Sequence, residues 1–316
     1  MPYRAAQDIV EAASALDSPF PVRAGCAAAR RTAAAFLGQG MMTEPEWRRA
    51  NRANWDERVG VHLGPGGYEL SELRAGTRKL NGIEAAELPA VEGKRILHLQ
   101  CHFGLDSLVL AQHGAEVVGL DFSAPAIAAA RGLAAELGLS DRARFVHADL
   151  YDALEAIPHP HGFDLVFVTW GSICWLPDIV RWAQIVAASL RCGGSIYLAE
   201  GHPTAYVFDD AARSGDGKPG FFAPYFSHEP VIVTDGADYV DPNARLANAT
   251  IYNWIHPLGS VVTNLIAAGM ALEWLHEHDG VPWRMFEILV KDASGLYRWP
   301  DKPWLPLAFS LSATRQ

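Results

Sequence analysis

Two aspartates stand where two apolar stretches of the chain end. Asp121 closes the run Val117–Leu120 and follows Gly104 by 17 residues. An acidic side chain placed in this way after a strand hydrogen-bonds the ribose hydroxyls of an adenosine-containing cofactor. Asp149 follows Phe145–Ala148 in the same manner. We expect the Asp121 carboxylate to bind a cofactor in this way, with a carboxylate at a helix N-terminus as the alternative. For Asp149 the alternative to a functional role is a solvated turn.

The loop between the first predicted strand and helix carries possible metal ligands, namely His98, Cys101 and His102. Even an open zinc site needs three protein ligands. Because successive strand residues point to opposite faces, we do not expect all three to converge, and we predict no metal site. The loop also lacks the Gly-x-Gly-x-x-Gly pattern of nicotinamide-binding folds, which disfavours an NAD-dependent oxidoreductase.

These residues need a scaffold, and from Arg95 onward the chain alternates strand and helix patterns. Ser123 can cap one of the helices, and Gly138 can end it. The alternation predicts an α/β fold with a doubly wound, mostly parallel sheet, whose ligands bind at the carboxyl ends of the strands. The predicted strands are Arg95–Leu99, Glu116–Leu120, Arg144–His147, Phe163–Thr169 and Ser195–Ala199; the predicted helices are Leu105–His113, Ser123–Leu137 and Asp178–Leu190.

Two further segments are expected to cover the carboxyl-end crevice. We expect an N-terminal helical lid over residues 43–94. We expect a cap insertion over residues 201–257, which are rich in aromatic residues, Pro and Gly. Within them we expect helices over Glu46–Val59 and around Leu70–Leu80, a hairpin of Val231–Thr234 with Ala237–Val240 around Asp235-Gly236, and a strand at Thr250–His256.

The two ends of the chain complete the predicted organisation. Residues 1–42 are rich in Ala and Arg and are expected to be a poorly ordered leader, with a transit-like segment as the alternative. Residues 43–316 are expected to form one domain, with residues 95–200 as its cofactor-binding core. Residues 258–316 would finish the core sheet, through a helix at Gly259–Ala268 and strands at Ala271–Leu275 and Leu305–Leu311.

Four loops, in order, carry a family resemblance: Ile96–Gly104, Val117–Ser123, Phe145–Leu150 and Phe163–Trp170. They resemble the class I S-adenosylmethionine-dependent methyltransferases, and a bacterial small-molecule branch of them in particular. The resemblance implies a Rossmann-like methyltransferase fold with a seven-stranded sheet, and S-adenosyl-L-methionine as cofactor.

The resemblance also implies roles for individual residues. Asp149 would accept the adenine amino group, and Leu150 would pack on the ring. The glycine loop departs from the family pattern, since His98 replaces an acidic residue and Gln100 and His102 replace glycines. The expected cofactor-binding residues are Trp55, Tyr68, Gln100, Cys101, His102, Gly104, Asp121, Phe122, Ser123, Asp149, Leu150, Thr169 and Trp170.

Methyl transfer requires a base only for some methyl acceptors, and histidine is the usual one near neutral pH. His202 follows the fifth predicted strand and His256 ends the strand of the cap, so we predict both as catalytic candidates; each could instead serve a turn or pack on a neighbour. Aromatic side chains predict a planar or aromatic small-molecule methyl acceptor, with ordinary core packing as the alternative. The expected substrate-binding residues are Trp175, Tyr206, Tyr252 and Trp254.

The net charge and the lengths of the apolar runs disfavour nucleic acids and membranes as partners. A net charge of −10 disfavours a nucleic-acid protein, and no apolar run is long enough to span a membrane. With no secretory pattern at the start, we expect a cytoplasmic enzyme that acts as a monomer or homodimer. The alternative functions are a non-catalytic protein that binds S-adenosylmethionine or S-adenosylhomocysteine and, less favoured, the NAD-dependent oxidoreductase.

Overall fold

The computed structural model describes residues 44–213, 215 and 217–316. The leader expected at residues 1–42 lies outside the described residues. Among the described helices, none is both long and apolar enough to cross a lipid bilayer.

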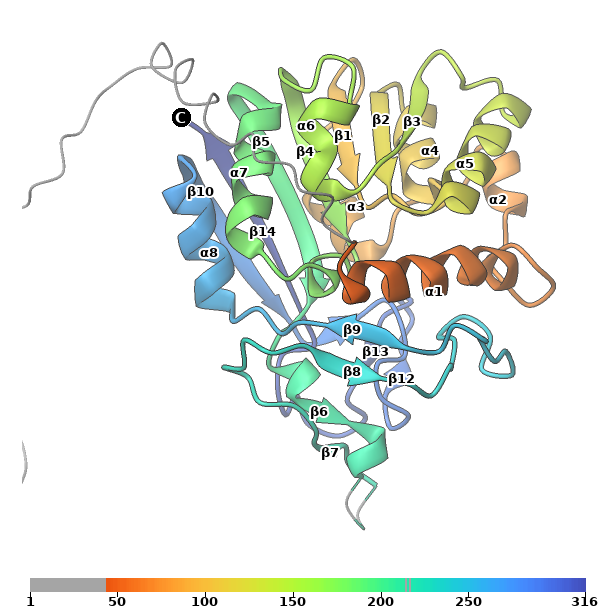
Figure 1. Ribbon diagram of the computed structural model, residues 1–316, viewed down its shortest axis with the longest axis vertical. Helices are drawn as coiled ribbons and strands as arrows, with labels where there is room; N and C mark the ends of the chain where they lie inside the picture. The colour runs from red at the N-terminus through yellow and green to blue at the C-terminus, as the bar shows by residue number, and fades with distance from the viewer. Residues whose placement is uncertain (1–43, 214, 216) are drawn as a thin grey trace, which may run out of the picture. The chain divides into compact units, whose positions relative to one another are not determined.

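A seven-stranded sheet forms the centre of the fold, with the strand order β10-β14-β5-β4-β1-β2-β3 (Figure 1). Neighbouring strands from β5 to β3 pair in parallel, and only β14 runs antiparallel to its neighbours β5 and β10. The predicted doubly wound, mostly parallel sheet is therefore confirmed. The strands are β1 (Arg95–Leu99), β2 (Glu116–Asp121), β3 (Ala143–His147), β4 (Phe163–Thr169), β5 (Leu190–Gly201), β10 (Met270–His278) and β14 (Ala308–Arg315).

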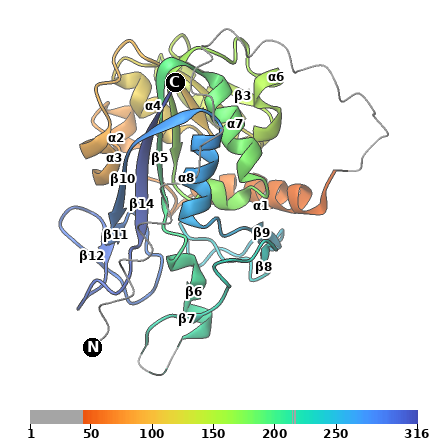
Figure 2. The same ribbon diagram turned by 90° about the vertical axis from the view of Figure 1, so that its left-hand side faces the viewer.

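Helices cover both faces of this sheet (Figure 2). Ile96 and Leu97 are adjacent on β1 and belong to different core clusters, as expected where successive strand residues point to opposite faces. Leu97 packs with residues of α7 and α8, and Ile96 packs with residues of α4 and α5. The helices are α4 (Leu105–Gln112), α5 (Ala124–Glu136), α6 (Ala153–Ala156), α7 (Ile179–Ser189) and α8 (Leu258–Ala267).

Local signals set several of these boundaries. The Ser123 hydroxyl accepts a hydrogen bond from Ala126 N and caps α5, as the sequence predicts. Asp178 caps α7 by accepting a hydrogen bond from Arg181 N at 2.9 Å. The helix expected around Leu70–Leu80 is wrong in extent, because Gly76 adopts a left-handed φ of 70° and breaks it. Two short helices form instead, α2 (Ser71–Arg74) and α3 (Gly82–Glu87).

The helix α1 (Glu46–His62) lies across the carboxyl ends of the strands, and the small strands β8 and β9 lie beyond it (Figure 1). These two strands pair with each other in antiparallel fashion. The short elements of this region are β6 (Phe208–Asp209), β7 (Gly220–Phe221), β8 (Val231–Val233), β9 (Ile251–Asn253), η2 (Leu150–Asp152), η3 (Ile173–Trp175), η4 (Ala205–Val207) and η5 (Asp210–Ala212).

Two features of the cap differ from expectation. The predicted hairpin of Val231–Thr234 with Ala237–Val240 is wrong, because Val231–Val233 pairs with Ile251–Asn253. The stretch after Gly236 is held against α1 by Asp238, which contacts Arg58. The segment that joins β10 to β14 in the sequence forms a small three-stranded sheet, which was not predicted because strands of two residues show no periodicity. Its strands are β11 (Gly280–Val281), β12 (Val290–Lys291) and β13 (Tyr297–Arg298).

Candidate active site

A cavity of about 450 Å³ lies at the carboxyl ends of β1, β2, β3 and β4. This volume is typical of small-molecule sites, which span roughly 300–1,000 Å³. Of the residues predicted to bind cofactor or substrate, the following line the cavity: Trp55, Tyr68, Gln100, Cys101, His102, Asp121, Phe122, Asp149, Leu150, Thr169, Trp170, Trp175 and Tyr206.

The loop after β1 keeps a glycine-type backbone although two of its glycine positions hold larger residues. Gln100 and His102 have φ values of 56° and 52°, and Gly104 has a φ of 78°. Such left-handed conformations cost a non-glycine residue about 1–3 kcal/mol and persist where the surroundings impose them. At Gly104 a Cβ atom would also lie 2.6 Å from the ring of Phe145. The loop therefore retains its shape with a different side-chain lining.

Asp121 joins this loop to the end of β2. Its Oδ2 accepts the backbone N–H of His102 at 2.8 Å, and its Oδ1 accepts that of Ser123 at 2.9 Å. Burial raises the pKa of Asp121 to about 6, although both N–H groups act against the shift. Each carboxylate oxygen has a further lone pair, so the group is fixed in place and still able to accept hydrogen bonds from a ligand.

Asp149 joins the end of β3 to the lid helix. Arg48 of α1 lies with its Nε 3.0 Å from Asp149 Oδ2, and Oδ1 accepts the backbone N–H of Tyr151. Burial raises the pKa of Asp149, against the opposing effects of the Tyr151 N–H and Arg48. A second link is the Ser123 hydroxyl, which donates to Asp56 of α1 at 2.6 Å. The lid is thus tied to two of the loops that end the sheet strands.

Residues 96–194 match the family model described as "Methyltransferase domain". The chain carries a methyltransferase domain. It is therefore a methyltransferase enzyme, and the sequence resemblance implies S-adenosylmethionine as its cofactor. No curated protein matches this methyltransferase.

Solved structures share its fold. A Mesorhizobium loti S-adenosylmethionine-dependent methyltransferase is 24% identical, with a TM-score of 0.51 over 73% of this chain and 97% of that one. A Listeria monocytogenes protein assigned to the same class is 18% identical, also with a TM-score of 0.51, over 73% of this chain and 95% of that one. The methyltransferase fold predicted from the sequence is confirmed.

The cavity of this methyltransferase offers polar atoms that suit the cofactor. Gln100 Oε1 and Thr169 Oγ1 are buried and have no hydrogen-bond partner among the described residues. Both residues line the cavity, as do Asp121 and the guanidinium-bearing Arg78. Because an unsatisfied buried polar atom costs about 1–3 kcal/mol, a ligand with ammonium and hydroxyl donors would relieve these positions. The residues present therefore fit S-adenosylmethionine.

Glu200 at the end of β5 organises the loop after β4, a role that the sequence did not reveal. Its carboxylate accepts the backbone N–H groups of Gly171, Ser172 at 2.7 Å, Ile173 at 2.9 Å and Gly201 at 3.0 Å. Burial raises the pKa of Glu200 in spite of these four donors. Glu200 thereby fixes the loop that forms one wall of the cavity.

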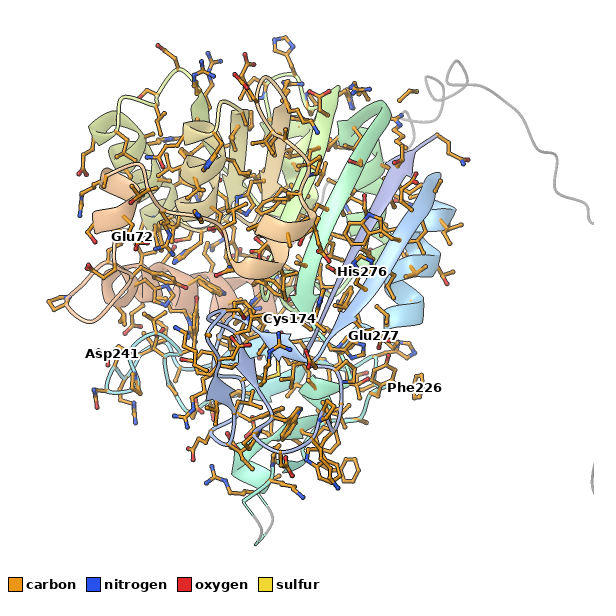
Figure 3. All side chains as sticks on the ribbon, turned by 180° about the vertical axis from the view of Figure 1, so that it is seen from behind. Glu72, Cys174, Phe226, Asp241, His276 and Glu277 are labelled. Carbon is orange, nitrogen blue, oxygen red and sulfur yellow. The ribbon has the colours of Figure 1, made fainter. Side chains whose placement is uncertain are left out.

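The two histidines predicted as catalytic lie elsewhere. His202 is buried, accepts the Thr204 N–H at Nδ1, and has its Nε2 3.1 Å from Glu277 on the edge strand β10. Figure 3 shows Glu277 on that strand and Cys174 beneath the strand ends. His256 donates from Nε2 to the Leu176 carbonyl at 2.8 Å and borders a separate small hollow. Neither ring lines the main cavity, because both are engaged by structural partners.

Four other predicted residues also lie outside the cavity lining. Trp254 packs edge-on against Trp47 with ring centroids 5.6 Å apart. The Tyr252 backbone hydrogen-bonds the Asn51 side chain in both directions, at 2.8 and 2.9 Å. Gly104 and Ser123 shape the loops instead: Gly104 by its turn and Ser123 by its cap. These four positions serve the scaffold of the site.

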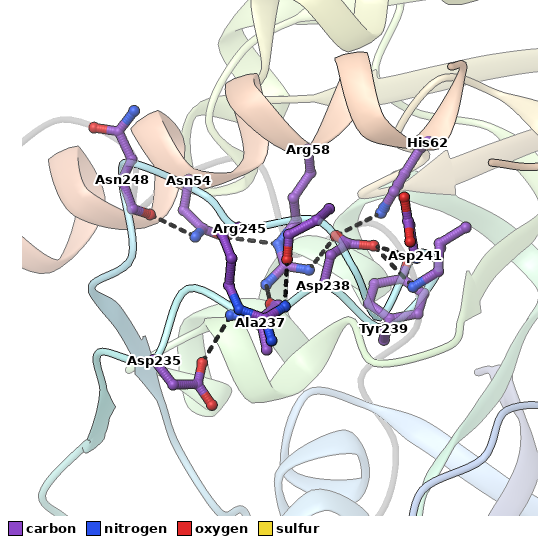
Figure 4. A network of polar contacts seen from close by, with 12 residues as sticks. Asn54, Arg58, His62, Asp235, Ala237, Asp238, Tyr239, Asp241, Arg245 and Asn248 are labelled. Atoms are coloured by element: carbon purple, nitrogen blue, oxygen red, sulfur yellow. Dashed lines mark hydrogen bonds and ion pairs between the residues drawn. The ribbon is translucent and has the colours of Figure 1, made fainter. Parts of the chain in front are cut away.

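The structure adds a buried polar cluster that the sequence analysis missed (Figure 4). Asn54, Arg58 and His62 lie one turn apart on α1, and all three are buried. Arg58 pairs with Asp238 of the cap at 2.7 Å, and His62 contacts both Asp238 and His102. The sequence signal that could have indicated this cluster is the polar stripe at positions i, i+4 and i+8 of a helix that covers the site.

Proposed function

We propose that this methyltransferase methylates a small planar or aromatic molecule at an oxygen, nitrogen or carbon atom. The observation that carries the proposal is the aromatic wall of the cavity. Aromatic side chains from the lid, the strand-end loops and the cap converge on it: Trp47, Trp55, Tyr68, Phe103, Trp170, Trp175, Tyr206, Tyr239 and Trp283. Such surfaces bind flat apolar molecules by stacking and edge-on contacts.

The cofactor-binding roles follow the polar groups of the cavity. Asp121 accepts the ribose hydroxyls, and Asp149 accepts the adenine amino group while Leu150 packs on the ring. Gln100 and Thr169 supply their free oxygen atoms to the ammonium end of the methionine moiety, and Arg78 pairs with its carboxylate. These assignments are supported by cavity lining and by the lone pairs that remain available.

The bound cofactor supplies an activated methyl group, and this chain positions the two reactants and excludes water from them. Trp55 of α1 packs edge-on against Trp175 at 5.2 Å, so the lid helix contacts the wall that would hold the methyl acceptor. Holding two reactants in line removes much of the entropic cost of their encounter. The buried walls also exclude water, which would otherwise solvate the reacting groups.

A small molecule is favoured over a polymer as methyl acceptor. The helix α1 crosses the strand ends, and Tyr239, Asn253 and Trp283 line the cavity from the cap and the small three-stranded sheet. The net charge of −10 gives no electrostatic attraction for a nucleic-acid backbone. A cavity lined by the helix α1 and the cap supports a small acceptor that enters it whole.

A panel assay tests this function. The full chain is incubated with S-adenosylmethionine and a set of phenols, aromatic amines, N-heterocycles, aliphatic alcohols and aliphatic amines, and S-adenosylhomocysteine is quantified by mass spectrometry. We expect product with planar compounds and none with the aliphatic ones. Turnover confined to aliphatic compounds or to added protein or RNA contradicts the proposal. Asp121→Asn serves as the cofactor-deficient control and Asp141→Asn, an exposed aspartate, as its match.

A further inference from the structure

A buried chain of three polar side chains connects the cap, the lid and the cofactor loop. Asp238 Oδ2 lies 3.1 Å from His62 Nε2, and His62 Nδ1 lies 2.8 Å from His102 Nε2. The side chains of Asp238 and His62 are fully buried. Figure 4 shows Asp238 between His62 and Arg58 beneath the helix α1. The chain ends at His102, which lines the cavity.

The partners decide where the protons lie. Burial acts to raise the pKa of Asp238, but His62 and the N–H groups of Val240 and Asp241 outweigh it and lower the pKa to about 2. The carboxylate can only accept, so His62 donates to it from Nε2. Arg58 already neutralises Asp238 at 2.7 Å, and a second cation at His62 would be buried without a counter-charge.

The tautomer of His102 then follows from that of His62. A neutral His62 that donates from Nε2 carries a lone pair at Nδ1, so His102 must donate to it from Nε2. This leaves the lone pair of His102 on Nδ1. That atom is buried and has no hydrogen-bond partner among the residues described by the structure. The ring of Trp55, which also lines the cavity, lies 5.1 Å away between centroids.

We propose that the Asp238–His62 pair fixes His102 as a neutral imidazole whose Nδ1 accepts a proton from a hydroxyl or amino group of the methyl acceptor. This inference rests on the proposed function of the cavity. His102 is the base, and Asp238 and His62 are positioning residues that set its tautomer. The backbone of His102 has a separate role, since its N–H binds Asp121.

The proton balance of methylation calls for such a group. Methylation of a neutral hydroxyl forms an O–C bond, breaks the S–C bond of the donor with its electron pair left on sulfur, and releases one proton. His102 Nδ1 takes up that proton, so one positive charge disappears at the sulfonium and one appears on the imidazole. The hydrogen bond from His102 Nε2 to His62, which Asp238 holds in place, keeps the ring oriented during this transfer.

The surroundings keep His102 uncharged before this step. Burial lowers its pKa well below the usual range, and the positive charge of Arg58 acts in the same direction, whereas Asp238 opposes them. Two tyrosine rings, Tyr68 and Tyr239, also face His62, with centroids 5.5 and 5.1 Å away. An imidazole that is neutral at pH 7 has the free lone pair that a base needs.

The position of the His102 proton tests this arrangement without any turnover. Protein with ¹⁵N-labelled histidine is studied by NMR in complex with S-adenosylhomocysteine, and His102→Gln assigns the His102 signals. We expect an unprotonated Nδ1 and a protonated Nε2. A protonated Nδ1 or an imidazolium at pH 7 overturns the proposal. Because no methyl acceptor is used, failure here is distinct from failure of the proposed function.

The variant Asp238→Asn tests whether Asp238 sets the tautomer of His102. Oδ1 of Asp238 accepts two backbone N–H groups, so the oxygen of the introduced amide stays on that side. Its NH₂ group then faces His62, and Arg58 loses the acceptor that Oδ2 provided. The hydrogen bonds then run in reverse and place the proton on His102 Nδ1. An unchanged His102 spectrum in this variant overturns the relay. Asp241→Asn, in the same loop, is the matched control and should leave the spectrum as in the unaltered protein.

Phenol, a small hydroxyl donor, probes the direction of Nδ1. Added to the complex with S-adenosylhomocysteine, phenol should shift the His102 Nδ1 signal in a saturable manner, and the shift should be absent in Asp238→Asn. An Nδ1 signal that stays unchanged throughout the phenol titration overturns the role of His102 as the base. If Asp238→Asn fails to fold, the phenol titration of the unaltered protein still decides the proposal.

Discussion

Asp121 Oδ2 accepts the backbone N–H of His102 at 2.8 Å, so the carboxylate that ends β2 and the loop that follows β1 hold each other in place. The sequence separates these residues by a helix and most of a strand. Their contact anchors the loop after β1 and leaves lone pairs on the carboxylate for a ligand. The proposed cofactor site therefore depends on both the charge and the placement of Asp121.

The first prediction concerns the affinity for S-adenosylhomocysteine. In Asp121→Asn the amide NH₂ replaces one oxygen that now accepts a backbone N–H, and a charge-assisted hydrogen bond to the ligand is lost. A loss of about 1.5–3 kcal/mol corresponds to an affinity that is about 10- to 150-fold weaker. Titration calorimetry measures it, with Asp141→Asn as the control. Equal affinity of both variants would rule out the ribose role of Asp121.

The second prediction concerns the pH dependence of that affinity. Burial raises the pKa of Asp121 to about 6, and ribose hydroxyls donate to the ionised form. Below pH 6 the ligand must displace a proton, so the affinity should fall by about fivefold between pH 6 and pH 5. The Asp121→Asn variant should show no such fall. Calorimetry in the two proteins across pH 5–8 checks the difference, and parallel curves would contradict it.

The third prediction concerns stability and Glu84 of α3. Burial raises the pKa of Glu84 to about 7, and its Oε2 has no hydrogen-bond partner among the described residues, whereas Oε1 accepts from Trp170 and Asn81. The folded protein thus holds this proton more tightly than the unfolded chain does. The free energy of unfolding should fall, by about 1–3 kcal/mol, as the pH rises from 4.5 to 7.

A matched pair of variants isolates that contribution. Glu84→Gln keeps an oxygen for Trp170 and Asn81 and has no charge, so it should be more stable than the unaltered protein at pH 8 and similar to it at pH 5. Glu72→Gln, on the exposed surface of α2, should follow the unaltered protein at both values. Urea unfolding at the two pH values makes the measurement. A Glu84→Gln protein destabilised at pH 8 would refute the explanation.

The fourth prediction concerns Glu200. Glutamine can present only one oxygen where the carboxylate accepts four backbone N–H groups, so Glu200→Gln leaves donors such as Ser172 N facing an NH₂ group. We expect a loss of about 1–3 kcal/mol in the free energy of unfolding. Turnover with any acceptor from the panel should fall as well, because the loop after β4 loses its anchor. Glu116→Gln, an exposed strand residue, is the control for both urea unfolding and turnover.

The core elements were predictable because their signals are local. The bounds of β1 and β4 agree with the sequence analysis, and Ser123 caps α5 as its position after Asp121 indicates. Parallel strands buried on both faces are continuous apolar runs, and their ends are marked by polar residues. Asp121 and Asp149 could therefore be placed at the cavity from the sequence alone.

The parts that were missed depend on contacts between distant segments. Asp238 was assigned to a hairpin, but its partners Arg58 and His62 lie 180 and 176 residues away in the chain. Glu200 carries no local sign that it accepts N–H groups from a loop 27 to 29 residues earlier. His202 was chosen for its place after a strand, and only the fold shows that its ring faces Glu277.

A crystal structure of the complex with S-adenosylhomocysteine tests the central claim most directly. The account predicts the ribose hydroxyls within hydrogen-bond distance of Asp121, the adenine beside Asp149 and Leu150, and the sulfur atom facing the aromatic wall that includes Trp175. A ligand bound outside this cavity, or a ribose held by other residues while Asp121 keeps only its backbone partners, would contradict the account.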